Sequence, residues 1–195
     1  MSELERITDQ LQRAYRGEAW HGPSIREVLD GVDADAASAR PVSNAHTIRE
    51  LVVHVVVWEK EALARLAGEG RDDLPPEEDW PAGVAAWADL LEELDAVHER
   101  LTSAISELDA EPGPVAGESA LDETVAGNPG TVYHLLHGVI QHNLYHTGQM
   151  AILKKALTID RVGSGYGERG TAGACEGDTA IRPGESARRE DAVST

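Results

Sequence analysis

Hydrophobic residues recur at helical spacing over the first 157 residues of the chain, and no segment shows the sustained alternation of a strand. Residues 2–16 place their apolar side chains on one face of a helix. Ser2 precedes this face and Glu5 follows three positions later, which is the pattern of an N-terminal capping box. The apolar positions are Leu4, Ile7, Leu11 and Ala14.

The same periodicity predicts three more long helices and one short helix. Ser24 is suited to cap a short helix over 25–32, and Ser43 or Asn44 to cap the next long one. Pro81 is suited to the first turn of the third long helix. The long helices are predicted at residues 2–16, 45–67, 81–108 and 130–157.

The segments between these helices are rich in residues that oppose helix. Residues 33–43 are predicted to form a loop, and 68–81, with paired prolines and two glycines, a connector. Residues 121–124 are predicted to add a short turn or a strand-like piece. The predicted fold is therefore all-α, a four-helix bundle with a short extra helix.

The composition changes beyond Asp160, where glycine, serine, threonine and charged residues replace apolar ones. We predict one bundle domain over residues 1–160 and a disordered, glycine-rich C-terminal tail over 161–195. The single cysteine, Cys175, lies in this tail and excludes an internal disulfide or a site with several thiolates.

The net charge of −18 argues against nucleic acid as a partner, because binding to phosphates depends on Lys and Arg. No apolar run approaches the length of a membrane span. The polar N-terminus does not resemble a secretory signal, so we expect a cytoplasmic protein without a membrane partner.

Histidines on two of the predicted helices indicate a metal site. On a helical wheel, His142 and His146 lie within about 40° of each other on the core-facing stripe, whereas His137 lies about 140° from His142. His54 lies at the edge of the apolar face of the helix over 45–67. Neutral imidazole is a common metal ligand, and three converging rings would leave one coordination position open.

Spacing alone leaves other interpretations open. A histidine on an apolar face is often a hydrogen-bonded core residue rather than a ligand. Glu50 or Glu61 could support His54 or approach the ion, and Gln149 could orient a ligand histidine. Trp58 is assigned to the core or a pocket wall, and His46 and His98 to the surface. The chain has no HExxH motif, so a zincin protease is not indicated.

Four segments together resemble the DinB-like (DinB/YfiT) family over residues 1–157. They are AWHGPSIREVL (19–29), HTIRELVVHVVVWE (46–59), EDWP (78–81) and LLHGVIQHNLYHTGQMAILKKA (135–156), of which HNLYHTGQ (142–149) is the most specific. The resemblance implies an up-down-down-up bundle, often a homodimer, and one divalent ion, zinc or nickel in most cases. The ion would be held by three histidines, which match His54, His142 and His146.

Function carries over from the resemblance less directly. Some relatives are S-transferases that depend on a low-molecular-weight thiol, so the leading hypothesis is a metal-dependent transferase. Its partners would be a small-molecule thiol and an electrophilic substrate. The alternatives are a metal-dependent hydrolase with Glu50 or Glu61 as general base, and a non-catalytic, metal-stabilised dimeric stress protein.

Overall fold

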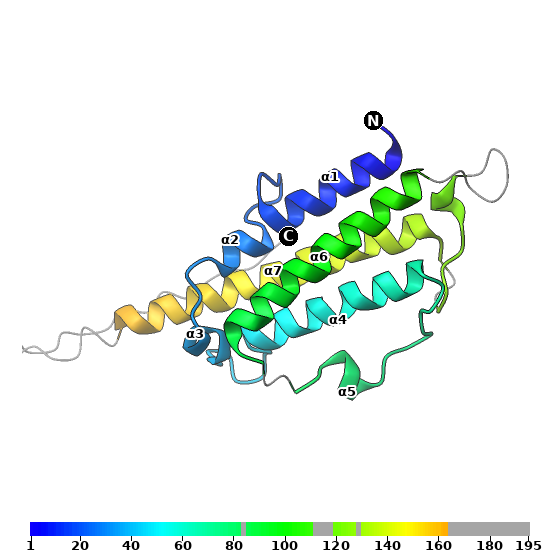
Figure 1. Ribbon diagram of the computed structural model, residues 1–195. Coiled ribbons are helices and arrows are strands. Elements are labelled where there is room, and N and C mark those ends of the chain that lie inside the picture. The colour runs from blue at the N-terminus through cyan, green and yellow to red at the C-terminus, as the bar shows by residue number, and fades with distance from the viewer. Residues whose placement is uncertain (83–84, 111–118, 128–129, 164–195) are drawn as a thin grey trace, which may run out of the picture.

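Four long helices form the body of the protein in the computed structural model, which describes residues 1–82, 85–110, 119–127 and 130–163. They are α1 (Glu3–Arg16), α4 (Ile48–Leu66), α6 (Trp87–Ala110) and α7 (Val132–Gly163). Figure 1 shows α1 and α7 running in one direction and α4 and α6 in the other. The predicted all-α, up-down-down-up bundle is therefore confirmed.

The order of the helices requires one long crossover. Because α4 and α6 are successive long helices that run parallel, the chain returns along the length of the bundle between them (Figure 1). This return carries the short helix α5 (Pro76–Asp79), which packs against α4. The helix α4 also contacts α6 and α7, so it lies between the crossover and the rest of the bundle.

Capping boxes set where the helices begin. Ser2 and Glu5 form the predicted box of α1, and Ser24 with Glu27 forms a second one at α2 (Ile25–Leu29). The expected cap of α4 at Ser43 or Asn44 is wrong. Thr47 caps this helix instead, because Glu50 stands three positions later and its carboxylate accepts the Thr47 backbone N–H at 2.7 Å.

Several boundaries differ from the predicted ones. The predicted loop over 33–43 contains a short helix, α3 (Ala34–Ser38), because the Asp33 side chain accepts the Ala36 N–H. The third long helix begins at Trp87 rather than Pro81, and the described residues 81, 82, 85 and 86 lie outside any helix.

The segment before α7 and the C-terminal end of α7 were also predicted from the sequence. The segment after residue 118 holds a 3₁₀ turn, η1 (Ala120–Asp122), and one antiparallel bridge between Thr124 and Thr131. The helix α7 continues beyond the predicted end at 157. Residues 161–163 of the predicted tail belong to α7, and the rest of it, with Cys175, lies outside the described residues.

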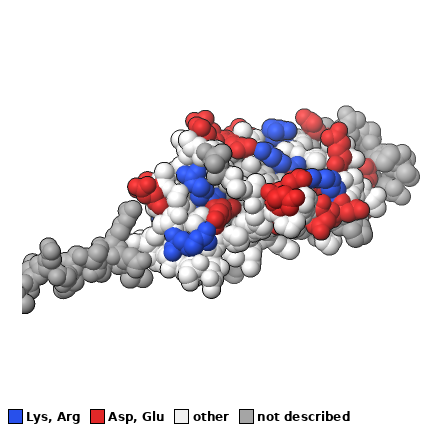
Figure 2. Space-filling model, turned by 90° about the horizontal axis from the view of Figure 1, so that it is seen from below, with Lys and Arg blue, Asp and Glu red and all other residues white. Residues whose placement is uncertain are grey.

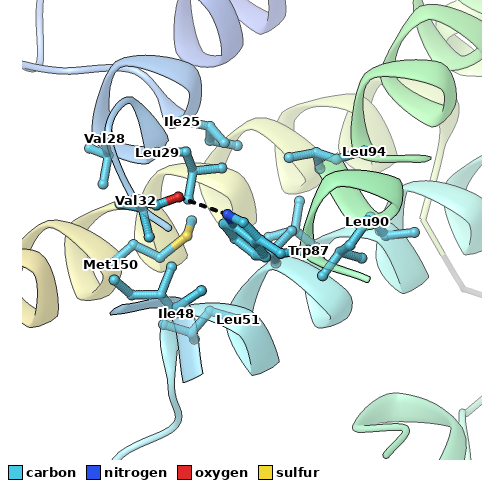
Figure 3. Close-up of a cluster of buried hydrophobic side chains, with 14 of the residues drawn as sticks. Ile25, Val28, Leu29, Val32, Ile48, Leu51, Trp87, Leu90, Leu94 and Met150 are labelled. Atoms are coloured by element: carbon cyan, nitrogen blue, oxygen red, sulfur yellow. Dashed lines mark hydrogen bonds between the residues drawn. The ribbon is translucent and has the colours of Figure 1, made fainter. Parts of the chain in front are cut away.

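The hydrophobic core forms two clusters along the bundle. In the one drawn in Figure 3, the Trp87 ring lies among side chains from α2, α4, α6 and α7, and its indole N–H donates to the Val32 carbonyl at 2.7 Å. The second cluster joins α1, α4, α6 and α7 near the other end. This packing fixes how α4 and α7 face each other. The labelled neighbours of Trp87 in Figure 3 include Ile25, Leu29, Ile48, Leu51, Leu94 and Met150.

The surface carries both signs of charge. On the face shown in Figure 2, acidic and basic side chains lie interspersed rather than in separate patches. In the described part of the chain, none of the helices combines the length and the apolar character required to cross a membrane.

We expect Leu94→Ala to lower the free energy of unfolding by about 2–5 kcal/mol, because Leu94 is completely buried and its removal leaves a cavity. Chemical denaturation measures the change. The matched control is Glu92→Ala, an exposed position on the same helix, for which we expect a change within about 0.5 kcal/mol. Equal losses in the two variants would contradict the assigned core.

Candidate metal centre

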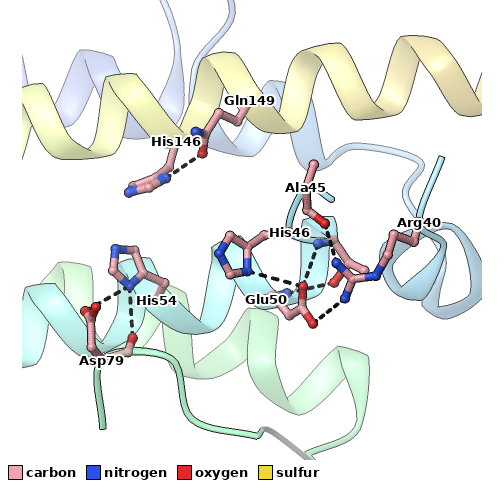
Figure 4. Close-up of polar contacts among 9 residues, drawn as sticks. Arg40, Ala45, His46, Glu50, His54, Asp79, His146 and Gln149 are labelled. Carbon is pink, nitrogen blue, oxygen red and sulfur yellow. Dashed lines mark hydrogen bonds and ion pairs between the residues drawn. The ribbon is translucent and has the colours of Figure 1, made fainter. Parts of the chain in front are cut away.

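Three histidines from α4 and α7 meet at the interface of these helices. One ring nitrogen each from His54, His142 and His146 lies within 4.8 Å of the other two. Across the two helices, Nε2 of His54 and Nε2 of His142 lie 3.0 Å apart. Figure 4 shows the His54 and His146 rings pointing toward each other from α4 and α7. The structure thus brings together the three residues that the sequence analysis singled out.

The hydrogen bonds made by Nδ1 of two of these rings determine which ring nitrogen faces the other histidines. Nδ1 of His54 donates to the backbone carbonyl of Asp79 at 2.9 Å, and Nδ1 of His146 donates to Oε1 of Gln149 at 2.8 Å (Figure 4). A neutral ring protonated at Nδ1 keeps a lone pair at Nε2. Both rings therefore present an acceptor nitrogen to the space between the helices. Gln149 has the orienting contact considered in the sequence analysis.

Asp79 is a part of the site that sequence reasoning missed. Besides accepting from His54, it accepts the Trp58 indole N–H at 2.8 Å through its carboxylate, which lies 3.3 Å from Nδ1 of His54. The expectation that Glu50 or Glu61 supports His54 is wrong. Glu50 pairs with Arg40 and caps α4, and Glu61 pairs with Arg65 and accepts the Arg71 N–H. The sequence feature that could have pointed to Asp79 was its position in EDWP, one of the segments that resemble the DinB-like family.

Trp80 covers one side of His54. The two rings stack with centroids 3.8 Å apart, and the His46 ring stacks on the opposite face of Trp80 at 3.6 Å. His46 is half-exposed, so it is at the surface as predicted, but it also closes this stack. The crossover segment therefore supplies both a hydrogen-bond acceptor and an aromatic wall to the site.

A buried polar cluster lies one turn further along α4. Glu59 is fully buried, and one of its oxygens accepts from Asn143 Nδ2 at 2.8 Å and lies 3.2 Å from Nδ1 of His98. His98 stacks on Tyr15 at 3.7 Å and is also fully buried, so its assignment to the surface is wrong. Leu94 and Leu101 stand four positions before and three after it, spacing that already placed His98 on the core face.

Burial keeps the three converging imidazoles neutral. Desolvation lowers the pKa of His142 to about 3, helped by the neighbouring His146 and His54. It also lowers the pKa of His54, against the opposing effect of Asp79, and the pKa of His146, against the opposing effect of Gln149. Neutral imidazole is the form that binds metals, so the site is in its binding-competent state at neutral pH.

The donor set fits a divalent transition metal. Zinc–imidazole bonds of about 2.0–2.1 Å in a tetrahedral site separate the ligand nitrogens by roughly 3.3 Å, between the 3.0 Å contact and the 4.8 Å limit found here. Two Nε2 atoms at 3.0 Å also require a proton or a cation between their lone pairs. Three imidazoles fill three coordination positions and leave another for a reactant.

The other histidines considered and Trp58 do not belong to the group of three. His137 packs against Tyr133 and is not part of the group of three. His134 and His21 are exposed. Trp58 lines a cavity beside His142, as expected for a pocket wall.

Fold and site define an all-helical protein with a three-histidine cluster that could hold a metal ion. A family model described as the DinB superfamily matches residues 7–150, and the chain therefore belongs to the DinB superfamily. No curated protein and no solved structure gives a match to the chain.

We expect His142→Ala to lower zinc affinity at least about tenfold, because it removes one of three ligands. Isothermal titration of the metal-free protein measures the affinity. The control is His137→Ala on the same helix, which we expect to bind zinc like the unchanged protein. Equal losses in both variants would contradict the assigned ligand face.

We expect the stability of the metal-free protein to fall between pH 7.5 and pH 5. Unfolded histidines take up protons near pH 6.5, whereas the folded His142 resists protonation until a pH of about 3. The folded state therefore loses stability as the pH falls below 6.5, by at most about 2 kcal/mol from His142 at pH 5.

Denaturation in the presence of a chelator at both pH values measures this loss. The variant His142→Gln lacks the titrating ring and should show a smaller decrease. An identical pH dependence in the variant would contradict the buried, neutral state of His142.

Proposed function

We propose that this chain is a metal-dependent S-transferase that joins a low-molecular-weight thiol to an electrophilic substrate. The observation that carries the proposal is a centre of three neutral imidazoles that opens onto a cavity of about 220 Å³ through His142. His54, His142 and His146 would hold one divalent ion, zinc or nickel. When bound, the ion would lower the pKa of a coordinated thiol and stabilise the thiolate.

The residues of the chain would position the reactants. Asp79 and Gln149 hold two imidazoles in the tautomer that presents Nε2. Trp80 covers His54 and limits the access of water from that side. In the reaction the thiol sulfur forms a bond to carbon, the bond from that carbon to its leaving group breaks, and the proton of the thiol passes to solvent.

In this proposal the sulfur would arrive with the cosubstrate rather than from a side chain of the site. Within the described residues there is no cysteine. The alternative of a hydrolase has lost its predicted general bases, because Glu50 and Glu61 are engaged by arginines. A purely structural ion would not require a cavity beside His142, so the cavity does not support that alternative. Pairing of two copies of the chain stays a prediction of the family resemblance.

Cobalt-substituted protein tests the proposal directly. Addition of a small thiol should produce a thiolate-to-cobalt charge-transfer band, and further addition of an aryl halide should consume thiol only when the metal is present. The control protein is His142→Ala, in which both signals should be lost. A cobalt spectrum that no thiol changes would exclude the transferase and leave a structural ion. Consumption of an ester without thiol would favour the hydrolase.

A further inference from the structure

The cavity beside His142 has walls of two different kinds. It lies between α4 and α7, and its apolar wall is formed by Trp58, Ala62, Leu135 and Val139. Gly138 leaves part of it open, since a Cβ atom added there meets nothing within 4 Å. His142 stands at its edge, so a molecule in the cavity lies next to the histidine cluster. This space suits a small, flat, apolar body.

Glu59 and Asn143 make the polar wall of the same cavity. Glu59 is fully buried and Asn143 is 1% exposed. One oxygen of Glu59 has two partners, but its Oε2 and the Asn143 Oδ1 have no hydrogen-bond partner among the described residues. Both are acceptors, and buried acceptors are stable only when a donor meets them. The polar wall therefore favours a ligand that carries hydrogen-bond donors.

The charges around the cavity point to the same ligand. Arg65 lines it as well, but its guanidinium is paired with the buried Glu61 at 3.0 Å and donates to the Arg71 carbonyl. Glu59 therefore has no arginine or lysine partner within the described residues, and its ion-pair contact is with the His98 ring at 3.2 Å. A cation or a neutral N–H donor is favoured next to it, and a compound without donors is not.

We propose that this cavity binds the electrophilic substrate and selects a planar, apolar compound that carries an N–H donor or a cationic group. The role of this ligand as the substrate rests on the proposed function. The binding of such a ligand in the cavity does not. The apolar body lies against Trp58, the donor group faces Glu59, and the reacting carbon lies toward His142. His98, stacked on Tyr15, holds the carboxylate in place from behind.

Three probes of nearly the same shape test the ligand class on the zinc-loaded, full-length protein. They are benzamidinium, benzamide and acetophenone, which differ in charge and in the presence of N–H donors. We expect the affinity to fall in that order, with acetophenone about tenfold or more weaker than benzamidinium. Saturation-transfer NMR and isothermal titration measure it. Equal affinity for benzamidinium and acetophenone would overturn the role of Glu59.

A pair of glycine variants on α7 tests whether the probes bind in this cavity. In Gly138→Leu the new side chain enters the cavity and leans toward the N-terminus of the helix, away from His142. In Gly148→Leu the same change is made at an exposed position where an added Cβ also meets nothing. We expect the first variant to lose benzamidinium binding and the second to keep it, with full zinc content in both.

The outcomes separate this inference from the proposed function. Absence of saturable binding, or equal binding in the two glycine variants, overturns the cavity as a ligand site. Thiol transfer that is unchanged in Gly138→Leu overturns its role as the substrate site, while the transferase stands. If Gly138→Leu abolishes probe binding but the unchanged protein transfers no thiol, the cavity stands as a ligand site and the transferase is refuted.

Discussion

The site depends on the burial of three neutral imidazoles between α4 and α7. Two of their Nε2 atoms lie 3.0 Å apart, a contact that is stable only with a proton or a cation between them. A neutral His142 ring can supply that proton in its Nε2–H tautomer, and burial lowers the pKa of all three rings, so none of them gains a second proton at neutral pH. A divalent cation satisfies all three lone pairs at once. The interface between the two helices could therefore hold an ion.

The unusual order of the helices has a consequence for this site. Because α4 and α6 are parallel, the chain between them must return along the bundle, and its short helix α5 packs against α4 (Figure 1). Asp79 and Trp80 lie on this return and contact His54 by a hydrogen bond and by stacking. The crossover thus orients a candidate ligand from outside the bundle, which a short loop between antiparallel helices could not do.

The sequence predicted the parts of the structure that follow from periodicity. His142 and His146 are one turn apart on an apolar face, so their convergence could be inferred from spacing, and the four long helices from their hydrophobic stripes. Asp79 could not be found in this way, because its contact with His54 depends on the path of an irregular segment. The Glu59, His98 and Asn143 cluster joins three helices, and such a contact is fixed only by how the helices pack. The start of α4 was missed although the Thr47 and Glu50 pair stood in the sequence.

The central claim is that His54, His142 and His146 bind one divalent ion together. X-ray absorption at the zinc edge of the loaded protein tests it most directly. Three imidazole nitrogens at about 2.0–2.1 Å, together with one oxygen ligand from solvent, are the predicted coordination shell. A shell with fewer than two imidazoles, or a protein that retains no zinc after gel filtration, would contradict the account.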